Sequence, residues 1–165
     1  LVQRAEIPLD AFSFDFPAVE VDRSKAVGKE REVLMIARTF AASARKIPGV
    51  MRVDVIDDLA RADTTKDDIA RRWLHMFRPG GNAIIGITLD PFNYIGTGIS
   101  SHGSPHDYDA RVPVLFFGPA FRHAKDEGEA RVVDIAPTLA HLLGLTPAEK
   151  LDGAILGRAF VPAPE

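Results

Sequence analysis

The segment at residues 101–118 contains the side chain best suited to bind a metal ion. His102 stands in a Ser-His-Gly-Ser-Pro sequence, shortly before the apolar run at residues 112–117. A glycine and a proline place this histidine in a loop, and the apolar run places the loop at the rim of a sheet, where catalytic and binding residues often lie. Neutral imidazole is a common zinc ligand. His102 is therefore a candidate metal ligand, and the alternative is a loop residue whose imidazole is hydrogen-bonded to the backbone.

A zinc site needs more than one ligand, and the neighbours of His102 offer few. His106 follows four residues later, but the intervening glycine and proline argue against a helix, so helical spacing does not apply. We interpret His106 as a residue at the rim of the site or, failing that, as solvent-facing. Asp107 and Asp109 are candidates to accept the second imidazole N–H of His102 and fix its tautomer. The alternative for each carboxylate is a turn residue that bonds its own backbone.

Other candidate residues have structural explanations. The chain has no cysteine, which excludes disulfides and thiolate ligands, so any zinc must sit on histidines and carboxylates. We interpret His75, His123 and His141 as structural or exposed. Asp134 precedes an apolar run with Pro137 near its start, and this pattern is typical of a helix N-cap.

The composition is that of one folded domain. The chain has 165 residues, of which 46% are hydrophobic and 26% charged, with a net charge of -3. The charges of both signs are interspersed, so no basic surface is expected for a nucleic-acid polymer or an anionic membrane. No apolar run approaches the ~18 residues of a membrane span. The amino terminus lacks an initiator methionine and a signal sequence, and we expect the chain to be a fragment of a longer protein.

Apolar periodicity predicts the elements that position the His102 loop. Helical spacing favours a helix within residues 28–47 and a second one that begins with a cap at Thr64 or Thr65 and ends near residue 77, with Arg71, Arg72 and Arg78 on a solvated face. Residues 50–56 alternate, and residues 83–89 are almost continuously apolar, which is typical of a central strand. Further segments are expected as short strands within 1–17, strands at 112–117 and 130–133, and a helix at 134–143.

These elements predict an α/β fold with a central sheet and flanking helices. The strands near 51–55, 83–89 and 113–117 are expected to share the sheet. The strand order does not follow from the sequence.

Three motifs in order carry a family resemblance. The stretch from His102 to Gly118, the Val-Asp-Ile-Ala-Pro-Thr-Leu sequence at 133–139 and the Leu-Asp-Gly sequence at 151–153 resemble the carboxy-terminal part of the alkaline phosphatase superfamily. The likeness is greatest to the type I phosphodiesterase and nucleotide pyrophosphatase branch. One departure is Arg111, where relatives often carry a histidine.

The resemblance implies a fold, an activity and a metal. Residues 1–165 would be a single domain, and a fragment of a larger alkaline-phosphatase-like catalytic domain that hydrolyses small phosphoric esters with two zinc ions. His102 would be one ligand of the first zinc, whereas the nucleophile and most other ligands would lie upstream. The isolated chain is then expected to be inactive and to self-associate, and the resemblance implies a periplasmic or extracellular location. The alternatives are a stand-alone binding or interaction module without catalysis, and the sulfatase or phosphoglycerate mutase branches.

Overall fold

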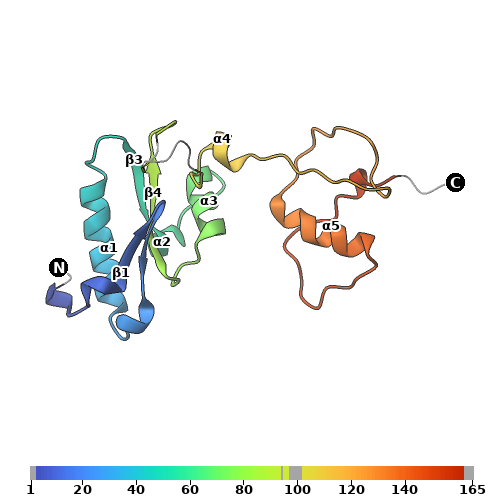
Figure 1. Ribbon diagram of the computed structural model, residues 1–165. Coiled ribbons are helices and arrows are strands. Elements are labelled where there is room, and N and C mark those ends of the chain that lie inside the picture. The colour runs from blue at the N-terminus through green and yellow to red at the C-terminus, as the bar shows by residue number, and fades with distance from the viewer. Residues whose placement is uncertain (1–2, 94, 97–101, 162–165) are drawn as a thin grey trace. The chain divides into compact units, whose positions relative to one another are not determined.

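The computed structural model of the chain describes residues 3–93, 95–96 and 102–161 (Figure 1). Internal contacts divide the chain into two compact units, Leu1–Arg111 and Val112–Glu165. Among the described residues no helix is long and apolar enough to cross a membrane. Each unit is taken in turn below.

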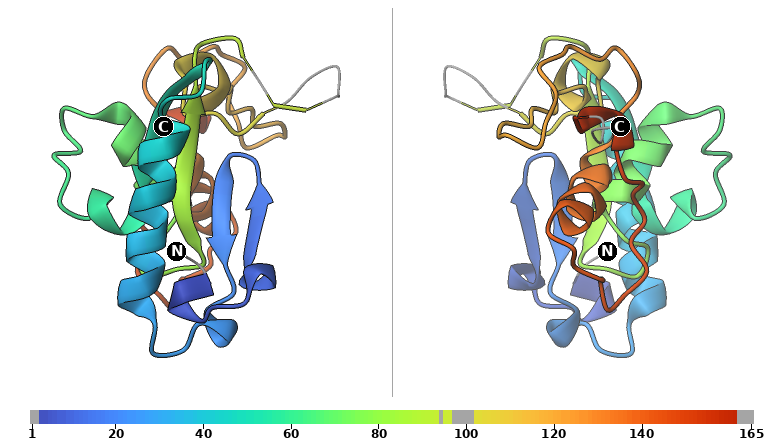
Figure 2. Two further views of the ribbon diagram at one scale, coloured as in Figure 1. Left: turned by 90° about the vertical axis from the view of Figure 1, so that its left-hand side faces the viewer. Right: turned by 90° about the vertical axis from the view of Figure 1, so that its right-hand side faces the viewer.

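The first unit is built on a four-stranded antiparallel sheet. Its strands follow the order β1-β2-β4-β3. Figure 2 shows the β1–β2 hairpin in blue, and β2 pairs with the edge of β4 that faces away from β3. All seven residues of β4 are buried, which confirms the central strand predicted from the apolar run. The strands are β1 Phe12–Asp15, β2 Ala18–Val21, β3 Val50–Val55 and β4 Ala83–Leu89.

Helix α1, Glu30–Ala44, covers one face of this sheet (Figure 1). Its apolar stripe packs against alternate residues of β3 and β4 and forms the main core, as the helical spacing within residues 28–47 predicts. The buried residues of the stripe are Val33, Ile36, Ala37, Ala41 and Ala44. Burial of side chains of this kind stabilises a fold by about 1.5–3 kcal/mol for each large aliphatic residue.

Helices α2, Ile56–Leu59, and α3, Asp68–Met76, lie over the opposite face (Figure 1). The fully buried Trp73 of α3 lies directly on Gly86 of β4, where a Cβ would stand 3.0 Å from Trp73 Cε2. The expected cap at Thr64 or Thr65 is wrong. Asp67 caps α3 instead, because its Oδ1 accepts the backbone N–H of Ala70 at 2.9 Å.

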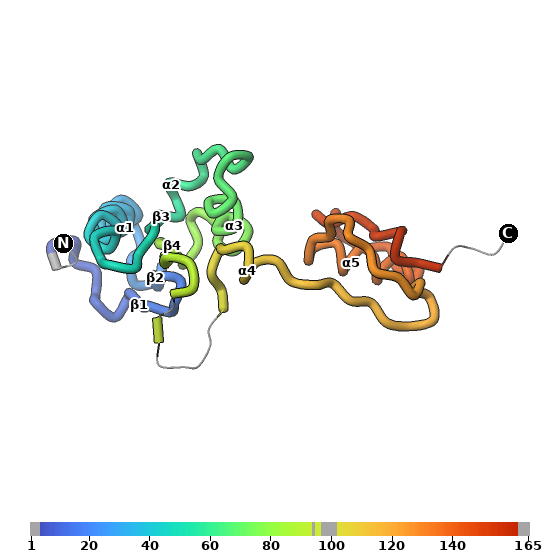
Figure 3. Tube along the Cα trace, turned by 90° about the horizontal axis from the view of Figure 1, so that it is seen from above, coloured from blue at the N-terminus to red at the C-terminus, as the bar shows by residue number. Residues whose placement is uncertain are grey.

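Short helical turns complete the first unit. Helix α4 spans Asp107–Ala110, in the region where the sequence predicts a loop. Seen from above, α4 lies beside α3 (Figure 3), and side-chain bonds from α3 to this region connect the two. The 3₁₀ turns of this unit are Gln3–Ala5, Leu9–Ala11 and Arg23–Lys25.

The second unit corrects two strand predictions. Residues 112–118 run without any strand pairing among the described residues, so the expected third strand of the sheet at 113–117 is wrong for this structure. Leu115 is 85% and Phe117 96% exposed. The strand expected at 130–133 is also absent from the described chain, and Val132–Asp134 forms a 3₁₀ turn instead. A strand needs an edge to pair with, and β propensity alone does not supply one.

Helix α5, Ile135–Leu142, begins after Asp134 as predicted, although the Asp134 carboxylate does not cap its first turn. Asp134 Oδ2 accepts the N–H of Arg131 at 2.8 Å, and Oδ1 accepts the N–H of Ala154 at 2.9 Å. Thr138 Oγ1 accepts the N–H of Leu156 at 2.9 Å. We call Asp134 and Thr138 the polar hub of this unit. A last 3₁₀ turn spans Gly157–Ala159.

Apolar burial in the second unit is small. Leu156 is the one apolar side chain that is buried among described residues 112–161. The hydrogen bonds of the polar hub and the stacked rings of Phe116, Phe121 and Phe160 therefore hold this unit together.

Candidate functional site

The segment that follows His102 is anchored at the end of the central strand. His106 Nε2 donates a hydrogen bond to the carbonyl oxygen of Leu89, the last residue of β4, at 2.8 Å. Pro105 is buried, and its carbonyl oxygen accepts a hydrogen bond from Arg72 Nη1 at 2.6 Å. Residues 105 and 106 therefore lie at the end of β4, at the rim of the sheet.

Arg72 joins this segment to helix α3. Besides the Pro105 carbonyl, its guanidinium binds Asp107 Oδ1 through Nη2 at 2.6 Å. The hydrogen bond from Arg72, followed by the charge of Arg111, lowers the pKa of the Asp107 carboxyl. The prediction of a solvated face is wrong for Arg72, whose side chain is 20% exposed. The prediction of a solvated face is correct for Arg71, which is 43% exposed and pairs with Asp68 one turn away. It is also correct for Arg78, which is exposed.

Asp109 closes the turn rather than orienting the imidazole of His102. Its Oδ2 accepts the backbone N–H of Ser104 at 2.6 Å. Asp107 is bound to arginines, as described above. In the described part of the chain neither carboxylate is bonded to His102. Asp109 bonds the backbone of its own turn, as in the alternative interpretation, whereas Asp107 pairs with arginine side chains.

His102 itself is exposed at the start of the described segment. The following Gly103 has a φ of +97°, a conformation that side chains rarely adopt, and this turn sets the direction of the backbone after His102. Ser101 and most of the glycine-containing stretch before it lie outside the described residues.

The described side chains do not make a complete zinc site. Among residues 3–93, 95–96 and 102–161, no group of three or more His, Asp or Glu side chains is placed to hold a metal ion. Three or four protein ligands are usual for zinc. His102 alone does not make such a site, and any zinc bound there would need further ligands from outside the described residues.

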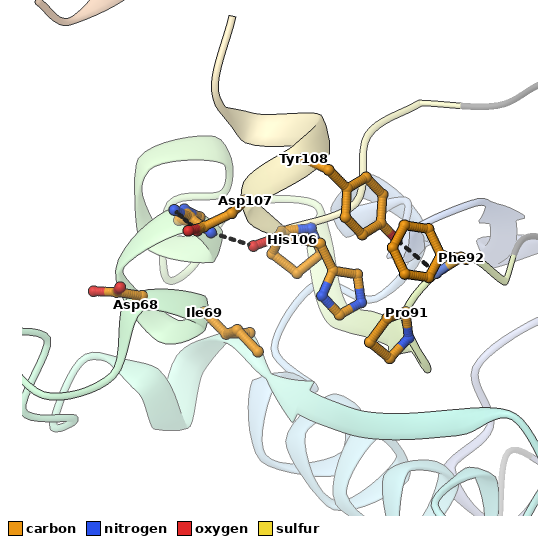
Figure 4. Close-up of a pocket in the computed structure, with 9 residues that line it drawn as sticks. Asp68, Ile69, Pro91, Phe92, His106, Asp107 and Tyr108 are labelled. Carbon is orange, nitrogen blue, oxygen red and sulfur yellow. Dashed lines mark hydrogen bonds and ion pairs between the residues drawn. The ribbon is translucent and has the colours of Figure 1, made fainter.

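The rings of His106, Tyr108 and Phe92 stack on one another (Figure 4). The His106 and Tyr108 ring centroids are 5.3 Å apart with 17° between the planes, and those of Tyr108 and Phe92 are 4.8 Å apart with 15°. The N–H of Phe92 donates to Tyr108 Oη at 2.9 Å, which ties the loop after β4 to α4. We call His106, Tyr108 and Phe92 the aromatic stack.

An open cavity of about 360 Å³ lies between the aromatic stack and α3. Its size is that of a small-molecule site. His106 lies at this cavity and is half-buried. The lining residues are Asp68, Ile69, Arg72, Pro91, Phe92, Pro105, His106, Asp107 and Tyr108.

Sequence reasoning missed Arg72, Phe92 and Tyr108. Arg72 binds partners 33 and 35 residues away, and no local pattern reports such a contact. Phe92 carried one weak signal of a functional role. It is an aromatic residue that follows an Asp-Pro turn, with no apolar run around it to indicate a core position.

The chain is similar to parts of larger known proteins. It is 41% identical over 59 residues, 35% of this chain, to the alkaline phosphatase PhoK of Sphingomonas sp. It is 40% identical over 70 residues, 42% of this chain, to the alkaline phosphatase PhoD of Zymomonas mobilis subsp. mobilis. A third match, 29% identical over 103 residues or 60% of this chain, is to a calcium-transporting ATPase of Myroides odoratus. No protein-family model matches the chain.

The matched stretches cover 11%, 11% and 18% of the lengths of these three proteins, respectively. The chain thus corresponds to a small part of each relative. Within that part, it shows a moderate similarity to alkaline phosphatases.

Proposed function

We propose that the chain is the carboxy-terminal part of a zinc-dependent phosphoric ester hydrolase, to which it contributes His102 as a metal ligand. The observation that carries the proposal is the identity of 41% and 40% to two alkaline phosphatases. The three ordered motifs support it, and they favour the phosphodiesterase and nucleotide pyrophosphatase branch. In this proposal residues 1–165 are one piece of a larger catalytic domain, and the substrate is a small phosphate ester.

The described residues have a defined role in this proposal. Arg72, the Leu89 carbonyl and Asp109 hold the segment after His102 through the contacts described above. These contacts hold the residues that directly follow Gly103. In this proposal they thereby set the position of the exposed His102 imidazole. Bound zinc would activate a nucleophile and stabilise the oxygen of the leaving group. The other ligands and the nucleophile are assigned to the rest of the longer polypeptide.

The test is a comparison of His102→Ala with His75→Ala in the full-length polypeptide that contains this chain. His75 is an exposed histidine on α3 and serves as the matched control. We expect His102→Ala to lower the turnover of an aryl phosphate or an aryl phosphodiester by orders of magnitude and to reduce the zinc content, while circular dichroism stays unchanged. Full activity and an unchanged zinc content in His102→Ala would end the assignment.

The isolated chain provides a second measurement. It should not hydrolyse either ester with added zinc, because one histidine does not make a site of three or four ligands. Submicromolar zinc binding together with turnover that His102→Ala abolishes would show that the chain is a complete enzyme. Binding of other molecules without any turnover, in the full-length polypeptide as well, would instead indicate a non-catalytic binding module.

A further inference from the structure

Phe92 has a backbone conformation that packing in the core does not explain. Its side chain is 84% exposed, and its φ is +65°, which is uncommon for a residue with a side chain. Such a conformation costs free energy and persists only where the surrounding contacts compensate for it. A ring so exposed gains little from the core, so the compensation has to come from its other contacts.

Tyr108 supplies these contacts (Figure 4). Its Oη accepts the backbone N–H of Phe92 at 2.9 Å, and the two rings stack with their centroids 4.8 Å apart. The same Tyr108 ring stacks on His106 at a centroid distance of 5.3 Å. Tyr108 is therefore the ring that both stacked pairs share, and it joins the residues after β4 to the start of α4.

A second contact joins the same two segments. His106 Nε2 donates to the Leu89 carbonyl oxygen across 17 residues, and the bond between Phe92 and Tyr108 spans 16 residues. His102 belongs to the stretch between them. Two contacts at the base of a stretch restrict the positions that its residues can reach, because its ends no longer move apart. We call these two contacts the clamp.

The clamp adds to the support of His102 that Arg72 and Asp109 provide. Those two side chains hold the segment after His102. The clamp ties that segment to the end of β4, from which the chain enters the stretch. A metal ligand has to be held within about 0.5 Å of its productive position. Support at both ends of the stretch narrows the positions of the imidazole toward this limit.

The location of the aromatic stack separates this role from a role in global stability. Tyr108 is 50% exposed. Loss of a ring that lies partly in solvent leaves no closed cavity and removes little apolar burial, so the free energy of global unfolding should change little. The effect of losing Tyr108 should instead be local, in the stretch that the clamp closes.

We propose that Tyr108 is a positioning residue for His102: it holds Phe92 against the start of α4 and thereby sets where the His102 imidazole meets zinc. The link to zinc rests on the proposed function above. The closure of the stretch by Tyr108 does not rest on it.

The first experiment measures native-state amide hydrogen exchange in the purified chain. Tyr108→Leu removes both stacked pairs, and exchange at Ser104, two residues from His102, should become about 5- to 150-fold faster, which is the effect of two aromatic pairs. Tyr108→Phe keeps the rings and removes the acceptor of the Phe92 N–H, so its effect at Ser104 should be smaller. Unchanged exchange at Ser104 in Tyr108→Leu would overturn the proposal.

Phe40→Leu is the matched control for this experiment. Phe40 is a 43% exposed aromatic residue of α1. Its replacement should leave exchange at Ser104 unchanged. An acceleration at Ser104 as large as that in Tyr108→Leu would show a global effect and would refute the clamp.

The second experiment measures zinc affinity and steady-state kinetics in the full-length polypeptide that contains this chain. Tyr108→Leu should weaken zinc binding and lower kcat for an aryl phosphate by about 10-fold or more, since a misplacement of about 1 Å can cost about 100-fold. KM should stay unchanged. Added zinc should restore the zinc content of Tyr108→Leu but not that of His102→Ala, because Tyr108 is not a ligand in this proposal.

The conservative variant and KM distinguish positioning from other roles. Tyr108→Phe should recover most of kcat, because the stacked rings remain. A rise in KM with kcat and zinc affinity unchanged in Tyr108→Leu would show that Tyr108 acts on the substrate, and it would overturn the positioning role.

The two proposals fail separately. If the full-length polypeptide does not hydrolyse phosphate esters while Tyr108→Leu still accelerates exchange at Ser104 in the isolated chain, the proposed function fails and the clamp stands. If the polypeptide is active and Tyr108→Leu changes neither kcat nor exchange at Ser104, the positioning role fails and the proposed function stands.

Discussion

Replacement of Arg72 by methionine tests whether helix α3 holds the His102 segment in place. Methionine keeps the apolar stem and removes two charge-assisted bonds, each 2.6 Å long, to the Pro105 carbonyl and to Asp107. The hydrogen bond from the charged guanidinium to the Pro105 carbonyl is worth about 1.5–3 kcal/mol, whereas the pair with the exposed Asp107 adds little because solvent screens it. The segment should therefore lose about 2–3 kcal/mol of local stability.

Native-state amide hydrogen exchange measures this loss where it occurs. At 1.36 kcal/mol for each factor of ten, exchange should become roughly 30- to 150-fold faster in α4 and leave β4 unchanged. The amides that report on the segment are those of Asp109, Ala110 and Arg111, which donate to His106 and Asp107 carbonyls.

Arg71→Met is the matched control, because Arg71 is the preceding residue of the same helix and pairs only with Asp68 among the described residues. It should leave exchange in α4 within about twofold of the wild type. Equal effects of the two variants, or no effect of Arg72→Met, would show that α3 does not hold the segment.

Three further changes probe the two units. Gly153→Ala should destabilise the second unit by about 1–3 kcal/mol in urea unfolding, because its Cβ would collide with the Val133 carbonyl oxygen. Gly157→Ala is the control and should leave the stability unchanged, because a Cβ there meets open space. Burial raises the pKa of Asp54 despite its pairing with Arg52, so the stability contributed by this group is complete below its unfolded pKa of about 4 and is lost as pH rises through its folded pKa. The free energy of unfolding of Asp54→Asn should therefore rise relative to that of the wild type between pH 4 and 7. A difference in unfolding free energy that does not change with pH would contradict this. The isolated chain should self-associate, which light scattering across a dilution series would detect. Phe117→Lys should reduce the mean mass, since the Phe117 side chain is almost fully exposed. A monomer at every concentration would count against self-association.

The first unit was largely predictable, because its elements depend on local patterns. The apolar stripe of α1 and the continuous apolar run of β4 each indicate an element that the structure contains. The start of α3 was misplaced, since several threonines and aspartates near it are suitable caps and only packing selects Asp67.

The residues at 112–117 show where pattern reasoning stops. Their apolar and β-branched side chains favour a strand, but the described part of the chain offers them no edge. The candidate site shows the same limit. The loop position of His102 followed from its glycine and proline neighbours, whereas Arg72 and the aromatic stack depend on contacts between residues far apart in the sequence.

The polar hub of the second unit has a thermodynamic consequence. The heat-capacity change on unfolding grows with newly exposed apolar surface and falls with newly exposed polar surface. The second unit is closed by Asp134 and Thr138, and among described residues Leu156 is its one buried apolar side chain. It therefore exposes less apolar surface when it opens than the first unit does. The curve of its unfolding free energy against temperature should therefore be flatter than that of the first unit. Cooling would then stabilise residues 112–161 over a range of temperature in which the sheet and α1 have already passed their stability maximum.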